Sequence, residues 1–82
     1  MPTILRFAGL RIVIYPNDHR PAHVHVIGND CEAVFELSCP RGRIALRENY
    51  AFGRLELGRI GQTLTLHQGK LCREWERIHG IE

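Results

Sequence analysis

The sequence predicts an α+β fold in which an antiparallel sheet of about five short strands is followed by a long or bent C-terminal helix packed on one face. Two observations predict it. Between residues 3 and 47, β-prone runs alternate with turns rich in Gly, Pro, Asn and Asp at near-regular spacing, which is typical of an antiparallel meander. Beyond residue 50, apolar residues recur about every 3.6 positions, the period of an amphipathic helix. Sheet and helix together predict a two-layer sandwich.

The first two strands are predicted at residues 3–7 and 10–15. Ala8-Gly9 separates two β-branched runs, and a two-residue connection that contains glycine is a hairpin signal. Pro16, Asn17 and Asp18 end the second strand, because proline cannot donate a ladder hydrogen bond and Asn and Asp close turns with their side chains.

The third strand is predicted from His23 to Ile27. Side chains alternate between the two faces of a strand, so Val24 and Val26 point one way while His23 and His25 point the other. Because the valines are apolar, we expect them to face the helix and the core. Both imidazoles should then lie on the opposite, solvated face of the sheet.

The last two strands are predicted at residues 31–37 and 43–47, after the turns at residues 28–30 and 38–42. In the fifth strand, Ile44 and Leu46 are expected to be the buried pair. The five strands together would form a β-meander over residues 1–48.

A helical segment is predicted over residues 53–79. Its apolar stripe comprises Leu57, Ile60, Leu64, Leu71, Trp75 and Ile78. Gly53 with Glu56 three residues later indicates a weak capping box at the start of the segment. The stripe keeps its phase through Gly69, so one long helix and two nearly collinear helices both fit. Glycine costs about 0.5–1 kcal/mol in a helix interior, and a bend is therefore expected at Gly69.

Size and composition predict a single domain over residues 1–82 in the cytoplasm. The net charge of +2 permits an anionic partner, but a dedicated DNA-binding domain usually carries a denser basic patch. Cys31, Cys39 and Cys72 are odd in number and lack C-x-x-C spacing, so reduced thiols are expected rather than a disulfide framework or a cysteine zinc site. No apolar run approaches the roughly 20 residues of a membrane helix, and the N-terminus lacks the apolar core of a signal peptide.

Three of the five histidines lie within residues 17–26, directly between two predicted strands. His23 and His25, two positions apart on a strand, could chelate one divalent metal ion such as zinc at Zn–N distances of about 2.0–2.1 Å. His19 could supply a third ligand, and Asp18 could be a ligand or an acceptor that fixes a tautomer.

The same residues permit two other interpretations. His19, His23 and His25 could carry out the metal-free acid–base chemistry of a small ribonuclease-like enzyme, with Arg20 stabilising a phosphate. Alternatively, the histidines hold a proline-containing turn or form an interface, with Asp18 accepting backbone N–H bonds. The H-x-x-x-H-x-H spacing does not choose among these interpretations.

Glu48, Asn49 and Tyr50, at the junction of sheet and helix, are further candidate binding residues. In a structural interpretation, Tyr50 and Phe52 fill the corner between the layers and Asn49 makes a turn. In a functional one, Glu48 and Asn49 reach the histidine cluster.

Several of these motifs resemble the small bacterial proteins grouped as domain of unknown function 4160. The motifs are the opening Met1-Pro2-Thr3-Ile4-Leu5-Arg6, Gly9-Leu10-Arg11, Asn17-Asp18-His19-x-Pro21-x-His23-Val24-His25-Val26, Glu48-Asn49-Tyr50-x-Phe52 and the terminal helix with Trp75. The resemblance covers essentially the whole chain. The chain departs from the family pattern at Ala22, where a second proline is usual, at Ala51, where Gly is common, and at Gly53, where Ser would cap the helix.

The resemblance implies a cytoplasmic bacterial protein, and the family name carries no established activity. No cofactor is expected, apart from the divalent metal of the alternative above. Members are often encoded beside another small protein, in an arrangement similar to a type II toxin–antitoxin pair. A small partner protein encoded nearby is therefore expected, bound through the sheet edge or the terminal helix. Assembly with further copies of the chain and contact with nucleic acid remain open.

Overall fold

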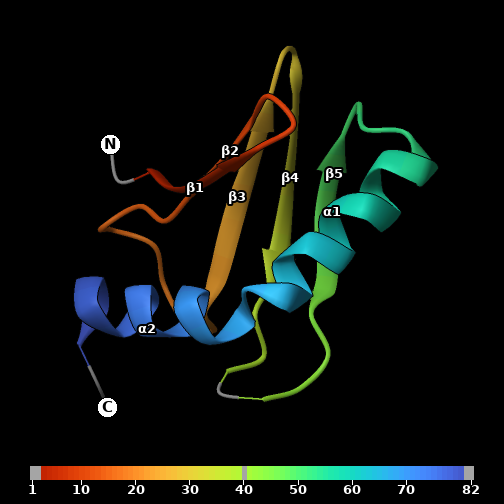
Figure 1. The fold of residues 1–82 in the computed structure, drawn as a ribbon. Helices are drawn as coiled ribbons and strands as arrows, with labels where there is room; N and C mark the ends of the chain where they lie inside the picture. The colour runs from red at the N-terminus through yellow and green to blue at the C-terminus, as the bar shows by residue number, and fades with distance from the viewer. Residues whose placement is uncertain (1–2, 40, 81–82) are drawn as a thin grey trace.

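The computed structural model describes residues 3–39 and 41–80, and the chain in these residues forms five strands followed by two helices (Figure 1). The elements are β1 (Thr3–Phe7), β2 (Leu10–Val13), β3 (His23–Gly28), β4 (Cys31–Glu36), β5 (Ala45–Tyr50), α1 (Arg54–Leu66) and α2 (Gln68–His79). The predicted α+β class, an antiparallel sheet followed by C-terminal helix, is confirmed.

The five strands form one antiparallel meander in the order β1-β2-β3-β4-β5. Tight turns connect β1 to β2 and β3 to β4, and the second pairs Gly28 with Cys31 across a two-residue loop. This register places His25 opposite Val34. Val24 and Val26 are fully buried, so the predicted alternation along β3 is confirmed for its core face.

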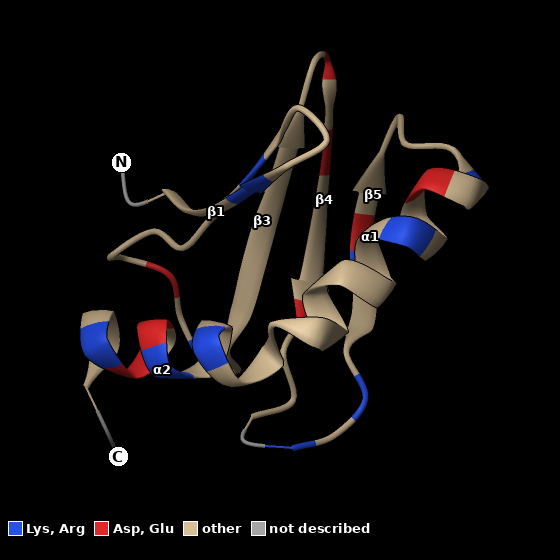
Figure 2. Ribbon diagram, in the orientation of Figure 1, with Lys and Arg blue, Asp and Glu red and all other residues tan. Residues whose placement is uncertain are grey.

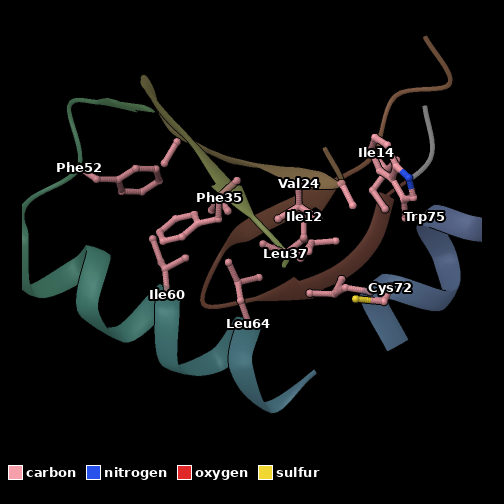
Figure 3. Close-up of a cluster of buried hydrophobic side chains, with 14 residues drawn as sticks. Ile12, Ile14, Val24, Phe35, Leu37, Phe52, Ile60, Leu64, Cys72 and Trp75 are labelled. Carbon is pink, nitrogen blue, oxygen red and sulfur yellow. The ribbon is translucent and has the colours of Figure 1, made fainter. Parts of the chain in front are cut away.

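The core lies between one face of the sheet and the two helices (Figure 3). Phe35 and Phe52 meet Ile60 of α1 at one end of the core, and Ile14 meets Trp75 of α2 at the other. Four residues of the predicted helical stripe are buried: Ile60, Leu64, Leu71 and Trp75. The other two, Leu57 and Ile78, pack at its margin.

Strand β5 differs from its prediction. It begins at Ala45 rather than at residue 43, and it continues to Tyr50. Ile44 is only partly buried and Leu46 is 46% exposed, so the expectation of a buried pair is wrong. The cause is position: β5 is the last strand of the sheet, and the nearby helical positions Gly58 and Gly61 carry no side chain to cover it.

The helical segment divides at His67, two residues before the expected bend at Gly69, and α1 and α2 run in clearly different directions (Figure 1). The His67 N–H donates to the Leu64 carbonyl, which tightens the last turn of α1. The side chain of Gln68 then donates to the carbonyls of Leu37 and Gly42, so the first turn of α2 is held against the end of β4. Tertiary hydrogen bonds, rather than the low helix propensity of Gly69, therefore set the break. Neither described helix is long and apolar enough to cross a membrane.

The N-terminus of α1 has half of the predicted capping box. The Glu56 carboxylate accepts the N–H of Gly53 at 3.0 Å, but glycine has no side-chain oxygen to accept the reciprocal bond. At the preceding corner, Asn49 bonds Phe52 twice: its amide donates to the Phe52 carbonyl and its oxygen accepts the Phe52 N–H, each at 3.1 Å. These two bonds fold the chain back, so that Phe52 enters the core while Tyr50 remains exposed.

A disulfide joins Cys39, after β4, to Cys72 in α2, so the expectation of three reduced thiols is wrong. Cys31 is the free thiol. The pair lies 33 residues apart in sequence, and only the folding of α2 beneath the end of β4 brings the two Cα atoms to 5.8 Å. An odd cysteine count without a spacing motif gave no means to predict the pairing.

Reduction of the Cys39–Cys72 disulfide should lower the free energy of unfolding by about 3–4 kcal/mol, the usual contribution of a cross-link that closes a loop of this length. Urea unfolding with and without dithiothreitol measures the change, and a Cys31→Ser variant is the matched control that leaves the disulfide intact. Alkylation of the unreduced, denatured chain should modify one cysteine. Modification of all three would contradict the disulfide.

Replacing Asn49 by Ala should lower the free energy of unfolding by about 1–2 kcal/mol, because both side-chain bonds to Phe52 are lost at the corner that leads into the core. Glu48→Ala, on the same strand and exposed, should change it by less than about 0.5 kcal/mol. Urea unfolding midpoints compare the two variants. Equal midpoints would show that Asn49 does not hold the corner.

Candidate functional site

The first candidate site is built around Asp18, in the turn that follows β2. The Asp18 N–H donates to the Tyr15 carbonyl at 3.0 Å, and the Asp18 carboxylate in turn accepts the Tyr15 N–H at 3.0 Å. These two bonds close the turn, as the Pro-Asn-Asp sequence predicts. They also fix the direction of the carboxylate, which faces His23 and His25 on β3.

His23 has a defined tautomer if it is neutral. Its Nδ1 lies 2.8 Å from the carbonyl oxygen of Pro21, and because a carbonyl can only accept, Nδ1 carries the hydrogen. The lone pair of the neutral ring is then on Nε2, which lies 3.6 Å from an oxygen of Asp18. An Nδ1–H bonded to a backbone carbonyl is a common arrangement around a metal-binding histidine.

His25 lies between two carboxylates. Its Nε2 is 3.2 and 3.3 Å from the two oxygens of Asp18, and its Nδ1 is 3.4 Å from an oxygen of Glu32. The contact with Glu32 lacks hydrogen-bond geometry, and Nδ1 is buried without a partner. The rings of Tyr15 and His23 lie edge-on to the His25 ring, at centroid distances of 4.8 and 5.3 Å. The imidazole is therefore held in position on both sides.

The sequence analysis expected both imidazoles on an open, solvated face, and this expectation is wrong. The side chains of His23, Asp18 and His25 are 8%, 14% and 16% exposed. The turn that carries Asp18 covers them on one side, and Trp75 of α2 reaches His23 with a ring centroid distance of 5.4 Å. The two histidines do share the sheet face opposite Val24 and Val26, but that face is covered at this point.

His19 and Arg20 do not join the group. Among the described residues, the ligand atoms that converge within 4.8 Å of one another belong to Asp18, His23 and His25. His19 is exposed, and Arg20 donates to the carbonyl of Gly80 just beyond α2. Of the four possible metal ligands named from the sequence, Asp18, His23 and His25 converge and His19 does not, and a catalytic role for His19 and Arg20 stays a prediction.

The predicted binding residues Glu48, Asn49 and Tyr50 lie on β5, apart from the histidines. Glu48 pairs with Val34, which pairs with His25, so two strand spacings of about 4.8 Å separate Glu48 from the histidine row. Asn49 is bonded to Phe52, as described above. The expectation that Glu48 and Asn49 reach the histidine cluster is therefore wrong.

A second candidate site is the hollow between the start of β5 and α1. Its volume is about 580 Å³, and it is lined by Arg43, Ile44, Gly58, Gly61, Gln62, Thr65 and Leu66. Leu66 is 83% exposed, and no atom lies within 4 Å of where a side chain on Gly58 would begin. Arg41 and Arg47 are exposed near Arg43, and Figure 2 shows Lys or Arg along the segment that leads into β5. The second site is thus an apolar hollow with a basic margin.

Sequence reasoning missed Glu32, the second carboxylate at His25. The sequence contained the signal. A two-residue turn at Asn29-Asp30 pairs Gly28 with Cys31, so Glu32 lies opposite Ile27, on the same face of the sheet as His25. The second site carries no motif, because it arises from side chains that are missing at Gly58 and Gly61.

Comparison with known proteins gives a family and no activity. Neither a search of curated proteins nor a search of solved structures found a match. One family model, described as "Domain of unknown function (DUF4160)", matches residues 9–76, and this range includes β2 to β5, α1, most of α2 and both candidate sites. The chain belongs to the DUF4160 family.

Proposed function

We propose that this protein is one component of a toxin–antitoxin-like module and that it binds a small acidic partner protein, encoded nearby, along the β5 edge and the hollow beside it. One observation carries the proposal: all six residues of β5 are exposed, and the strand lies beside an apolar hollow of about 580 Å³.

The exposed apolar residues support a docking surface here. Leu46 belongs to the core-facing side of the sheet, because it pairs with the buried Phe35, and yet it is half exposed. Together with Ile44 and Leu66 it leaves one margin of the core uncovered. Apolar side chains from a partner would complete this layer, in the way that buried anchors complete most protein interfaces.

The charges around the hollow support an acidic partner. Arg41, Arg43 and Arg47 are exposed along the approach to β5 and on the strand itself. Carboxylates on the partner would complement them, raise the association rate and disfavour a second copy of this chain, which would bring the same arginines to the interface.

The edge of β5 limits how a partner can pair with it. The register shifts between Val34 and Phe35, where Arg47 is the extra residue of β5, so the ladder is irregular at mid-strand. An irregular edge is a poorer template for a long partner strand than a regular one. The hollow, rather than a long run of backbone pairing, therefore provides most of the proposed contact.

Co-expression with the neighbouring gene product should yield a complex on size-exclusion chromatography with light scattering. Leu66→Glu should weaken it about 30-fold or more, the effect of losing a central anchor worth about 2 kcal/mol. Leu55→Glu is the matched control, because Leu55 is a second exposed leucine of α1 that does not line the hollow, and it should leave the affinity unchanged.

A second substitution tests the hollow without removing an exposed side chain. Gly58→Leu should place a side chain in open space, keep or raise helix stability and block the partner. Failure of the two proteins to co-purify would contradict the proposal. So would a homodimer of this chain alone that Leu66→Glu dissociates, because the surface would then bind a second copy.

A further inference from the structure

We infer that Asp18, His23 and His25 form a binding site for one divalent transition-metal ion, with zinc as the reference ion and Glu32 as the outer partner of His25. The inference concerns the other face of the sheet from the hollow and does not rest on the partner proposal. It uses three of the four residues that the sequence analysis named as possible ligands and leaves out His19.

The hydrogen-bond requirements of His25 are the first step. Its two ring nitrogens each face a carboxylate, Asp18 on Nε2 and Glu32 on Nδ1. A neutral imidazole has one N–H, so it can serve one carboxylate while its lone pair faces the other anion. A cation between Nε2 of His25 and Asp18 would contact the nitrogen lone pair and the carboxylate together.

His23 presents a second Nε2 to the same carboxylate. Its Nδ1–H is committed to Pro21, so the lone pair on Nε2 of the neutral ring faces Asp18 at 3.6 Å. A single cation placed among the three groups would receive lone pairs from both Nε2 atoms and from the carboxylate at once.

The spacing of the three groups fits a transition-metal ion. Ligand atoms bound tetrahedrally at about 2.0–2.2 Å lie about 3.3–3.6 Å from one another. One oxygen of Asp18, Oδ1, lies 3.3 Å from His25 Nε2 and 3.6 Å from His23 Nε2, so these two spacings match the tetrahedral value. All three ligand atoms lie within 4.8 Å of one another, so the two imidazoles would move closer together when they bind one ion. Two imidazoles and one carboxylate are a donor set used for Zn²⁺ and Fe²⁺ rather than for Mg²⁺ or Ca²⁺.

The surroundings resemble the outer shell of a metal site. His23 Nδ1 is bonded to the Pro21 carbonyl, and His25 Nδ1 lies 3.4 Å from Glu32 without hydrogen-bond geometry, so both Nε2 atoms are left for the ion. Near them, Trp75 Nε1 and His79 Nε2 are buried without partners in the described structure, and the two rings are stacked at a centroid distance of 3.8 Å. Buried polar atoms without partners are rare in folded proteins, and here they accompany the proposed site.

The turn alone does not explain why residue 18 carries a charge. The Asp18 side chain closes the turn by accepting one N–H from Tyr15, and an asparagine oxygen would accept the same bond. The negative charge therefore serves the side of Asp18 that faces the imidazoles. Asp18→Asn is accordingly the test variant, because it keeps the turn and removes the charge.

The first measurement uses the unmodified protein, purified without a histidine tag and stripped with a chelator. Titration with Zn²⁺ by calorimetry should give one site per chain, and Co²⁺ should give the visible absorption bands of a low-coordinate nitrogen and oxygen site. In ¹⁵N-labelled protein, zinc should shift the Nε2 signals of His23 and His25 and leave those of His19 and His67 unchanged. This last measurement needs no variant and so does not depend on a variant's folding.

The variants then assign the ligands. His25→Ala and Asp18→Asn should each weaken Zn²⁺ binding by at least about 100-fold, and Glu32→Gln by about 10–100-fold, as for other outer partners. His19→Ala, next to Asp18 in sequence, should leave the affinity unchanged. The inference is overturned if the unmodified protein binds no zinc, if zinc leaves the His23 and His25 signals unchanged, or if folded Asp18→Asn binds zinc as tightly as the unmodified chain.

Discussion

A five-stranded sheet that carries helices on only one face must close its whole core with a single helical layer. The strands span about 19 Å across the sheet, at about 4.8 Å between neighbours, and the 13-residue α1 is about 20 Å long. In the structure α1 packs against the β5 end, where Ile60 meets Phe35 and Phe52, and α2 packs against the other, where Trp75 meets Ile14 (Figure 3). The two ends of the core are thus covered by two helices of different direction, and the helical layer bends between them at His67 (Figure 1).

The bend is held by bonds to the sheet. Gln68 donates to two carbonyls in the segment that follows β4, and Cys72 is joined to Cys39 in the same segment. Both anchors are in the first half of α2, so the direction of this helix is set where it begins. With that direction fixed, Trp75 reaches both the core and the ring of His23. The covering of the histidine site thus depends on the anchoring of α2 just beyond the end of β4 that pairs with His23.

Local patterns predicted most of the fold, because strand alternation and the helical stripe depend only on the spacing of apolar residues along the sequence. Val24, Val26, Ile60 and Leu64 are buried as their periods require. The failures all depend on tertiary position. Leu46 has a suitable pattern for burial but lies on an edge strand, and nothing within its own strand reveals that α1 has no side chain to place over it.

The same distinction between local pattern and tertiary position applies to the candidate site. The sequence indicated that His23 and His25 share one face, since that follows from a separation of two residues on a strand. It could not choose between Asp18 and His19 as the third member of the group. Side chains alternate between two faces along a strand, but a turn has no such alternation to fix their direction. The bond from the Tyr15 N–H makes the choice in the structure.

The two candidate sites occupy opposite faces of the sheet, and β4 lies between them. Its Val34 separates His25 from Glu48 on one face, while its Phe35 lies beside Leu46 on the other. The irregular register at Arg47 also distinguishes the two faces of β5, because it turns Leu46 toward the helices and Glu48 away from them. The same irregularity blunts the edge against unselective strand pairing, as natural sheets commonly require. In the proposed complex, side chains that fit the hollow and its arginines would select the partner, and the residues of the proposed metal site would take no part in that selection.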